Sequence, residues 1–504
     1  MQVNQKSLNK PVFFPPLIVL LLTVAYGIYA PEEFLNMVKS ANSWILTHFG
    51  WLFTWSSFLF LLLILAIYFS PIGKTRFGGK EAKPTLSKHT WFAIAICTTT
   101  ASALIFWACA EPLYHLNSQT DGLNLTVGSK EAVAFSMSTL FMHWSFTPYG
   151  IYTVAGLAFA HAYYNLKQPF SIGSMMYPLL KENAHGKIGD IADIICLYAL
   201  ILGMSASLGG GLLAILGGLE TNFGISSSSN LMLMVCVVIV CTFIISSATG
   251  LTKGIRFFSN INISIFIGLA FFVFILGPSK EIITTALNGA KDYVVNFLPR
   301  SLNINSGIQK EWYDSWTNYY LANWYAWAPI TSLFLGRLAI GYTVRDFINF
   351  NLLFPSLFAI IWMSIFGGTT LHFDILGNGE LFQYMTAFGE GNAMYAMFSK
   401  LSYGNVMSLF ALAMLFIAFI TAADSNVSAM SALSSKDIHP TSPEAAIWIK
   451  VIWGVLIGTV SYIMLTYAGI DGIRILSVLG GFPSMFLIII AALGLLKMLI
   501  YSKP

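Results

Sequence analysis

Twelve apolar stretches, each long enough to cross a lipid bilayer, constrain this sequence more than any other feature. A helix needs about 20 predominantly apolar residues to span the hydrocarbon core of a bilayer. Of the 504 residues 56% are hydrophobic and only 10% are charged, a composition unlike that of soluble domains. The stretches cover approximately residues 12–30, 50–70, 90–116, 133–164, 187–218, 229–250, 256–278, 316–338, 348–370, 403–432, 446–467 and 475–501. We therefore expect an all-α integral membrane protein with twelve transmembrane helices.

The positions of Lys and Arg predict how these helices are oriented. If the N-terminus is cytoplasmic, 18 of the 26 basic residues fall on the cytoplasmic side and 8 on the other side. Basic residues concentrate in the cytoplasmic loops of membrane proteins. An odd number of spans would remove the excess of Lys and Arg on the cytoplasmic side. We predict a multi-pass protein of the cell inner (plasma) membrane with both termini in the cytoplasm.

Short connections between the stretches predict a single membrane domain. Residues 279–302 differ, because their apolar side chains gather on one side of a helix, as in a helix that lies in the outer interface. The third and eighth stretches carry polar interruptions at residues 98–102 and 323–332, the latter including Pro329, and paired broken helices indicate inverted repeats. The expected parts are a tail with two peripheral helices, a first repeat, the interfacial helix and a second repeat, at residues 1–89, 90–278, 279–302 and 316–501.

Several classes of function are not indicated by the sequence. The net charge of +4 is explained by the excess of Lys and Arg in the predicted cytoplasmic loops, and it gives no reason to expect nucleic-acid binding. The five cysteines lie in apolar stretches without metal-ligand spacing, so we predict neither a metal site nor a disulfide nor a cofactor. The sequence has no phosphate-binding loop, HExxH motif or nucleophile elbow. We expect neither an enzyme nor an ATP-driven pump.

A dense run of aromatic residues, 315–327, opens the eighth stretch. Several Trp and Tyr rings that converge inside a membrane protein can hold a methylated ammonium group, at about 0.5 to 2 kcal/mol per ring. The alternative is an interfacial aromatic belt. A belt needs rings only at a helix end, whereas Trp324 and Trp327 continue inward at i, i+3 spacing. We therefore favour a cation-binding site.

Several motifs together resemble those of the betaine/carnitine/choline transporter family. Residues 316–324, with the sequence WTNYYLANW, are similar to the family signature W-T-x-F-Y-W-A-W-W. The further matches, in chain order, are Glu111-Pro112-Leu113-Tyr114, His143-Trp144 followed by Tyr149 and Tyr152, Lys253-Gly254-Ile255-Arg256, Phe334-Leu335-Gly336-Arg337, Thr343-Val344-Arg345-Asp346-Phe347 and Thr421-Ala422-Ala423-Asp424-Ser425. The resemblance covers roughly residues 10 to 500.

This resemblance implies a leucine-transporter-like core in the third to twelfth spans, with two additional N-terminal helices, a curved interfacial helix and assembly as a homotrimer. Members of the family hold a trimethylammonium headgroup in a box of aromatic side chains. Carried over by motif, the substrate-binding residues are Trp144, Tyr149, Tyr152 and Trp324, with Tyr114 at the edge and Trp327 lower on the pathway. The alternative for each ring is packing in the core or against lipid.

Two signature positions depart from the family pattern, because Leu321 and Asn323 stand where Trp is usual. The Asn323 amide is a candidate to hydrogen-bond a substrate oxygen, and the alternative is a bond to a neighbouring helix.

The residues expected to couple transport to an ion also depart from the pattern. Sodium-driven members commonly carry Gly-x-Gly-x-Gly in the third span, whereas residues 100–104 here read TASAL and resemble the carnitine/butyrobetaine exchangers. Those exchangers replace the ion with Arg and Met, yet the matching residues here are Asn262 and Thr331. The candidate ion or coupling site comprises Asn262, Thr331, Ser332, Thr421 and Ser425. We favour the alternative that these groups make hydrogen bonds between helices.

Ionisable residues inside a membrane are costly and suggest function. Glu111, Asp424 and Arg337 are the candidate gate residues. For Glu111 we favour a structural role, as a cap or a pairing partner near the interface, over a proton relay. Asp424 is expected to pair with Arg256 or Arg337, and the alternative for Arg337 is to anchor a helix end.

These features predict a secondary transporter of small methylated amines that works by alternating access. The candidate substrates are compounds of the trimethylamine N-oxide, carnitine, betaine or choline type. Osmotically regulated members of the family carry long charged tails, whereas the tails expected here are short. Together with the altered residues at the expected sodium-binding positions, this favours sodium-independent exchange of a substrate for its product. A sodium-coupled uptake symporter is the alternative, and an amine channel or a non-transporting receptor is the alternative of another class.

Overall fold

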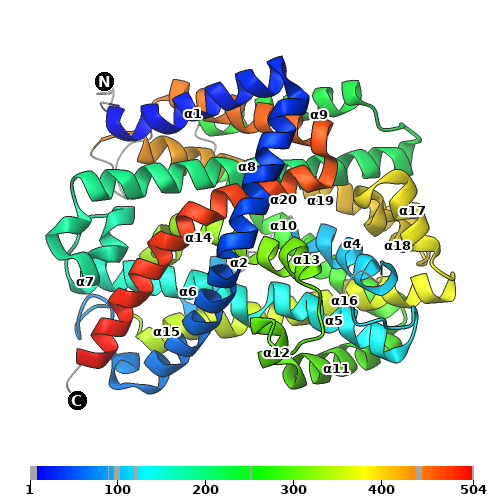
Figure 1. Cartoon of the computed structure of the whole chain (residues 1–504), viewed down its shortest axis with the longest axis horizontal. Helices are drawn as coiled ribbons and strands as arrows, with labels where there is room; N and C mark the ends of the chain where they lie inside the picture. The colour runs from blue at the N-terminus through cyan, green and yellow to red at the C-terminus, as the bar shows by residue number, and fades with distance from the viewer. Residues whose placement is uncertain are drawn as a thin grey trace.

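The computed structural model describes residues 8–88, 90–92, 94–95, 103–118, 122–249, 252–436 and 445–501, and the side chains of residues 248–263 are not described. Within these ranges the regular structure is helical, with two isolated β-bridges and no strand (Figure 1). The predicted all-α fold is therefore confirmed.

The first half of the chain forms helices that match the first seven predicted stretches. They are α1 (Lys10–Tyr29), α2 (Pro31–Phe69), α4 (Ala103–Asn117), α5 (Lys130–Trp144), α6 (Phe146–Ala160), α7 (Tyr177–Leu180), α8 (Lys187–Phe223), α9 (Ser229–Thr249) and α10 (Thr252–Leu276). Shorter 3-10 turns are η1 (Pro71–Lys74), η3 (Ile172–Met176) and η4 (Lys181–Ala184), and η2 (His161–Asn165) is a π turn.

The second half begins with the interfacial segment. Its helices are α11 (Ser279–Val295), α12 (Phe297–Leu302), α13 (Lys310–Tyr313), α14 (Tyr319–Arg337), α15 (Val344–Ile348), α16 (Phe354–Leu376), α17 (Glu380–Phe388), α18 (Ala393–Ser399), α19 (Gly404–Leu433) and α20 (Ile447–Tyr501). Two π turns, η5 (Asp314–Asn318) and η6 (Asn349–Leu353), precede α14 and α16, and η7 (Glu390–Asn392) is a 3-10 turn.

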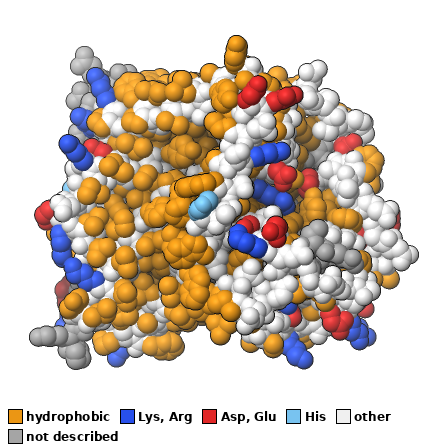
Figure 2. Space-filling model, viewed as in Figure 1, with side chains coloured by type: hydrophobic (Ala, Val, Ile, Leu, Met, Phe, Trp, Pro, Cys, Tyr) orange, Lys and Arg blue, Asp and Glu red, His pale blue; other side chains and the backbone are white. Residues whose placement is uncertain are grey.

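Seven helical segments of the described chain are long and apolar enough to cross a membrane, and the bent pair α10–α11 raises the number to eight. The 55-residue α20 contains both the eleventh and the twelfth predicted stretch, and Gly469 interrupts its helical geometry with φ 55° and ψ −138°. Figure 2 shows a broad apolar surface on the face that carries α2 and α20 in Figure 1. The number of twelve crossings stays a prediction.

The start of α1 and the end of α20 lie at the same edge of the molecule, on the left of Figure 1.

The structure corrects two of the predicted spans, the second and the eighth. The second helix begins at Pro31, well before the predicted residue 50, and runs without a break to Phe69. The predicted interruption at Pro329 does not occur, because α14 continues through this residue. Transmembrane helices tolerate proline, because neighbouring helices, hydroxyl side chains and local adjustments of the helix can compensate for the missing N–H. The Ser332 hydroxyl donates to the Pro329 carbonyl at 2.6 Å, a bond within the same helix. The polar run at residues 98–102 lies outside the described residues.

The fourth predicted span is divided instead. Ser145 adopts φ −120° and ψ −122° between α5 and α6, so the helix stops directly after Trp144. Pro148 explains the break, because a proline lacks the N–H that would bond to the carbonyl four residues earlier, which is that of Trp144. Regular bonding resumes when the Tyr149 N–H donates to the Ser145 carbonyl at 3.2 Å.

The amphipathic segment forms α11 and α12, and α11 turns away from α10 by 105°. Ile282 and Tyr293 of α11 are buried against the core, whereas Ile283, Leu287 and Val294 are exposed. An ion pair between Asp292 and Arg300 contacts Ser138 of α5, whose hydroxyl donates to Asp292 Oδ2 at 2.5 Å. The interfacial segment is therefore fixed to the helix that ends in Trp144.

The aromatic helix α14 packs chiefly against α20 and α6. Its contact with α20 depends on Gly481, where a Cβ atom would lie 2.0 Å from the backbone carbonyl oxygen of Ala322. The Cβ atom would be attached rigidly to the α20 backbone, and the carbonyl oxygen belongs to the α14 backbone, so neither atom can rotate away.

We predict that Gly481→Ala forces α14 and α20 apart and destabilises the protein by about 1 to 3 kcal/mol, the range typical of overpacking. The readout is the melting temperature of the purified protein in detergent. Gly210→Ala is the matched control, because a Cβ atom there meets nothing within 4 Å and alanine favours a helix. An unchanged melting temperature for Gly481→Ala alongside a normal control would contradict the proposed helix contact.

Candidate functional site

Four of the predicted box residues come together around one indole ring. The Trp324 ring of α14 has its centroid 4.8 Å from that of Tyr152 and 5.1 Å from that of Tyr149, both on α6. The centroid of the Trp144 ring lies 6.1 Å from that of Trp324. Trp144 ends α5, on the other side of the break at Ser145 from the two tyrosines. All four side chains are at most 5% exposed. The motif-based grouping of residues 144, 149, 152 and 324 is thus reproduced in space.

The Trp324 ring contacts each of the other three rings, and Tyr149 also contacts Tyr152. Aromatic side chains with centroids 4.5 to 7 Å apart are in packing contact, and their planes here are inclined by 60° to 87°. A trimethylammonium group therefore needs at least one ring to move aside before it can reach the centre. We call these four residues the aromatic box.

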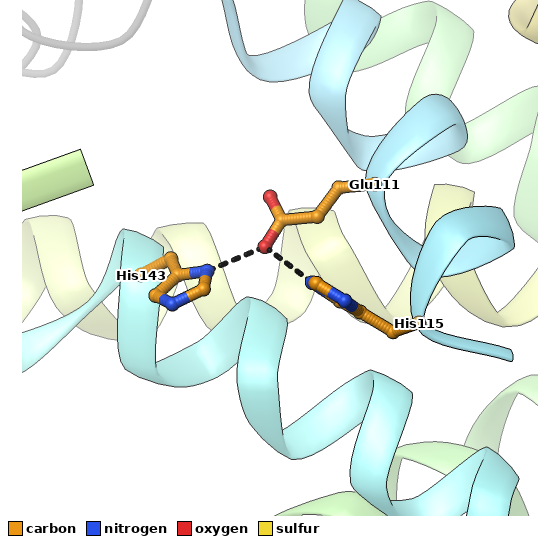
Figure 3. Close-up of side chains that lie close together, drawn as sticks. All are labelled: Glu111, His115 and His143. Carbon is orange, nitrogen blue, oxygen red and sulfur yellow. Dashed lines mark hydrogen bonds and ion pairs between the residues drawn. The ribbon is translucent and has the colours of Figure 1, made fainter. Parts of the chain in front are cut away.

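A buried hydrogen-bond network holds the Trp144 side of the box. The Trp144 Nε1–H donates to Glu111 Oε2 at 2.9 Å. The other oxygen of Glu111 lies 2.6 Å from Nδ1 of His143 and 3.2 Å from Nε2 of His115 (Figure 3). Nε2 of His143 lies 3.0 Å from the Thr317 hydroxyl of η5. Glu111 therefore connects α4 to α5 and fixes the orientation of the Trp144 ring.

The same network reaches the Trp324 side, since the Trp324 Nε1–H donates to the backbone carbonyl of His143 at 3.2 Å. The His143 ring stacks on Tyr320 with 4.6 Å between centroids and 25° between planes. The Trp144 indole is thus oriented by Glu111, and the Trp324 indole by the backbone of His143.

Glu111, His115 and His143 also form a group of metal-ligand types, with ligand atoms all within 4.8 Å of one another. The contacts at 2.6 and 3.2 Å are hydrogen-bond distances between these groups themselves. Both imidazoles are therefore hydrogen-bonded to the Glu111 carboxylate.

The remaining predicted substrate residues lie outside the aromatic box. The Tyr114 hydroxyl donates to Glu390 Oε1 at 2.6 Å, and its ring contacts Trp316. The Asn323 side-chain oxygen accepts from the Ser477 hydroxyl of α20 at 3.1 Å, which is the helix-to-helix alternative. The Trp327 indole lies against Gly203 of α8, where a Cβ atom would be 3.2 Å from the indole nitrogen.

The candidate coupling residues are divided between two helices. Thr331 and Ser332 lie on α14, and the Thr331 side chain interacts with the Tyr152 hydroxyl. Thr421 and Ser425 lie on α19, where the Thr421 hydroxyl bonds to the Ile417 and Ala418 carbonyls and the Ser425 hydroxyl to the Thr421 carbonyl. The Asn262 side chain lies outside the described residues.

The candidate gate residues are also separated. Asp424 is buried and accepts a hydrogen bond from Ser246 of α9 at 3.1 Å. Arg337 is exposed at the end of α14, where its guanidinium lies 6.0 Å from the Phe334 ring centroid. No ion pair joins Asp424 to Arg337 in the described part of the chain, and the Arg256 side chain lies outside it. The position of Arg337 matches the helix-anchor alternative.

Sequence reasoning missed the partners of Glu111. His115 follows Glu111 by four residues on a helix, a spacing that places two side chains on one face and was readable from the sequence. Thr317 and Tyr320 have no such signal, because they approach His143 only through the packing of α14 and η5 against α5.

The sequence is similar to known proteins over almost its whole length. The sequence model of the family described as "BCCT, betaine/carnitine/choline family transporter" matches residues 11–503. The chain is 29% identical to a probable glycine betaine transporter of Desulfitobacterium hafniense (strain Y51), over 96% of each chain. It is 27% identical to an ectoine/hydroxyectoine transporter of Virgibacillus pantothenticus, over 99% of this chain and 98% of the relative.

A third relative is the high-affinity choline transport protein of Escherichia coli (strain K12), which is 28% identical over 98% of this chain and 73% of its own length. A solved Na+-coupled sialic acid symporter aligns with 90% of this chain and 87% of its own, with 16% identity and a TM-score of 0.46. Because the family match spans nearly the whole sequence, the chain belongs to the betaine/carnitine/choline transporter family and is a membrane transporter, not an enzyme.

Proposed function

We propose that this protein is a secondary transporter that exchanges small methylated amines across the inner membrane by alternating access, without coupling to sodium. The substrate class is a compound with a trimethylammonium or similar headgroup, such as trimethylamine N-oxide, carnitine, betaine or choline. The headgroup binds in the aromatic box, and release occurs on the opposite side of the membrane.

The observation that carries this proposal is the convergence of Trp144, Tyr149 and Tyr152 on Trp324. Ring faces attract a cation without the desolvation cost of a buried carboxylate, and each desolvated ring contributes about 0.5 to 2 kcal/mol. Four such rings provide enough attraction to select a quaternary ammonium group. The relatives named above are described as transporters of glycine betaine, ectoine and choline, which supports the same class of substrate.

The hydrogen bonds of the candidate coupling residues support sodium independence. A sodium ion needs several oxygen ligands around one point, whereas the Ser332 hydroxyl donates to the Pro329 carbonyl within α14, and Thr421 and Ser425 lie on α19. Helix α14 packs mainly on α20, α6 and α8, and the Thr421 and Ser425 hydroxyls bond within their own helix. These contacts favour a structural role for the four hydroxyl groups.

We further propose that the protein assembles as a homotrimer with both termini in the cytoplasm. The excess of basic residues predicted for the cytoplasmic side and the common edge of the first and last helices support this orientation.

Trp324 is the central ring of the aromatic box. Trp324→Leu removes the ring that Trp144, Tyr149 and Tyr152 all contact, so we expect loss of saturable uptake of choline, glycine betaine, carnitine and trimethylamine N-oxide into proteoliposomes. Tyr152→Phe keeps a ring and loses only the hydroxyl, so its apparent affinity should stay within about threefold of wild type, as a cation–π contact requires.

The matched control for Trp324→Leu is Trp362→Leu. Trp362 is an equally buried indole on α16 that stacks on Phe266 and Phe366, away from the box. This variant should lose stability but keep its apparent substrate affinity. Saturable uptake with normal affinity in Trp324→Leu would remove the aromatic box as the binding site.

The second prediction concerns energy coupling. Uptake of each labelled amine should require an unlabelled amine inside the vesicles and should not change when a sodium gradient is imposed. Thr421→Ala should leave this exchange unchanged within about twofold, because the hydroxyl bonds only to its own helix among the described contacts.

Uptake into empty vesicles that depends on an inward sodium gradient, together with its loss in Thr421→Ala, would instead identify a sodium symporter. Flux that neither saturates nor responds to internal amine would identify a channel, and binding without any flux would identify a receptor.

A further inference from the structure

The cluster of Glu111, His115 and His143 has a property that amine binding alone does not require. It places three titratable side chains in contact inside the protein, with the carboxylate and both imidazoles nearly inaccessible to solvent. Figure 3 shows the two imidazoles approaching the same carboxylate oxygen from α4 and α5.

The hydrogen-bond pattern fixes the positions of two protons. An ionised carboxylate oxygen can only accept, so Nδ1 of His143 and Nε2 of His115 must each carry a hydrogen when Glu111 is charged. The second carboxylate oxygen accepts the Trp144 indole N–H. With each imidazole carrying one proton, the cluster has a net charge of −1.

Each imidazole then keeps one unprotonated nitrogen that can bind a further proton, Nδ1 on His115 and Nε2 on His143. Nε2 of His143 is the unprotonated nitrogen in that state, and it accepts from the Thr317 hydroxyl at 3.0 Å. If this nitrogen gains a proton, the hydroxyl can rotate and accept instead, so the contact survives in both states. The net charge of the cluster then changes from −1 to 0.

The other charged and titratable groups around the cluster come from several helices. Tyr319 and Tyr320 of α14 approach from one side, and Tyr320 stacks on His143. Arg474 of α20 lies 4.3 Å from the Trp316 ring centroid, and His115 packs on the same ring at 4.6 Å. Arg474 in turn pairs with Asp471 at 3.4 Å.

The remaining groups on helices packed against α4 have partners elsewhere. Asp374 of α16 accepts from Asn117 at 2.8 Å, and Glu390 of η7 accepts from Tyr114 at 2.6 Å. Glu111 therefore has two imidazoles as the bonded partners that can carry a positive charge, and the Tyr320 side chain also approaches its carboxylate. Arg474 contacts the Trp316 ring.

The cluster is connected to the aromatic box through both of its indoles. Trp144 donates to Glu111 itself, and Trp324 donates to the His143 backbone carbonyl. A negative cluster behind the Trp144 ring attracts a cation on the ring, whereas a neutral cluster does not. A bound cation and an additional proton on the cluster therefore oppose each other.

We propose that Glu111, His115 and His143 form a proton-binding site that is coupled antagonistically to the amine in the aromatic box, so that binding of a cationic headgroup releases about one proton. This inference rests on the proposed function, because the aromatic box is taken as the binding site. Glu111 and His143 act as positioning residues that adjust the charge behind Trp144 and touch no substrate.

The consequence is a pH-dependent affinity with a defined sign. Choline and glycine betaine keep their headgroup charge from pH 5.5 to 8.5, so any pH dependence in this range comes from the protein. Affinity should fall as the pH falls through the range in which the cluster takes up its proton, by up to tenfold per pH unit if one proton is exchanged.

The test is isothermal titration calorimetry of the purified full-length protein with choline, in two buffers of different ionisation enthalpy at pH 5.5, 7.0 and 8.5. Wild type should release about one proton per choline at the pH where its affinity changes. Glu111→Gln removes the negative charge and should bind choline more weakly than wild type at pH 8.5, with little pH dependence and no proton release. His143→Gln should likewise flatten the pH profile.

His372→Gln is the matched control, because His372 lies on α16 outside the cluster and its loss should leave the pH profile of wild type. Glu111→Asp keeps the carboxylate and should retain a pH dependence. Zero proton release by wild type at all three pH values, or a wild-type pH profile in Glu111→Gln, would overturn the proposal.

A substrate-free measurement separates this proposal from the proposed function. The chain has eight histidines, so ring-labelled imidazole signals can be followed by NMR during a pH titration and assigned with His115→Gln and His143→Gln. At least one of these two imidazoles should titrate in wild type and shift its midpoint in Glu111→Gln. If no amine binds at any pH but this titration is found, the proposed function fails and the proton site stands; if neither imidazole titrates, the proton site fails.

Discussion

The buried carboxylate of Glu111 is the interaction on which the aromatic site depends. A charge inside a membrane protein is tolerated only when hydrogen-bond partners replace water, and Glu111 uses both oxygens for that purpose. One oxygen contacts His115 and His143, and the other orients Trp144. The carboxylate therefore orients the Trp144 ring directly, and the backbone carbonyl of His143, whose side chain Glu111 contacts, holds the Trp324 ring.

The box is divided between three helices. Trp144 ends α5, which the Glu111 network and the Asp292–Arg300 pair hold in place. Tyr149 and Tyr152 begin α6 beyond the break at Ser145, and Trp324 belongs to α14. The rings are packed against one another, so entry of a headgroup needs a displacement at this junction. The non-helical backbone at Ser145 provides a joint for such a movement without breaking a regular helix.

The apolar spans were predictable because the bilayer requires long hydrophobic segments, whereas the irregularities depend on individual contacts. Pro329 was expected to break its helix, but α14 continues through it, as transmembrane helices often allow at proline. The break at Ser145 could have been read from Pro148, whose missing N–H removes the partner of a carbonyl in the preceding turn. The start of α2 was missed because its first turns carry polar residues such as Glu32 and Glu33 and lack a continuous apolar run.

The aromatic residues of the site were predictable from the family motif, but their supporting contacts were not. The pairing of Asn323 with Ser477 and of Tyr114 with Glu390 joins residues more than 150 positions apart, and periodicity carries no information about such pairs. The role of Glu111 as a bridge to Trp144 depends on how α4 packs against α5. Local sequence therefore indicated the chemistry of the site, and tertiary packing decided which residues reach it.

The most direct test of the central claim is a cryo-electron microscopy structure of the protein with bound choline or glycine betaine. The account predicts headgroup density within about 6 Å of the ring centroids of Trp144, Tyr149, Tyr152 and Trp324, with at least one of these rings displaced from its present packing. Headgroup density at another position, with the four rings still in mutual contact, would contradict it.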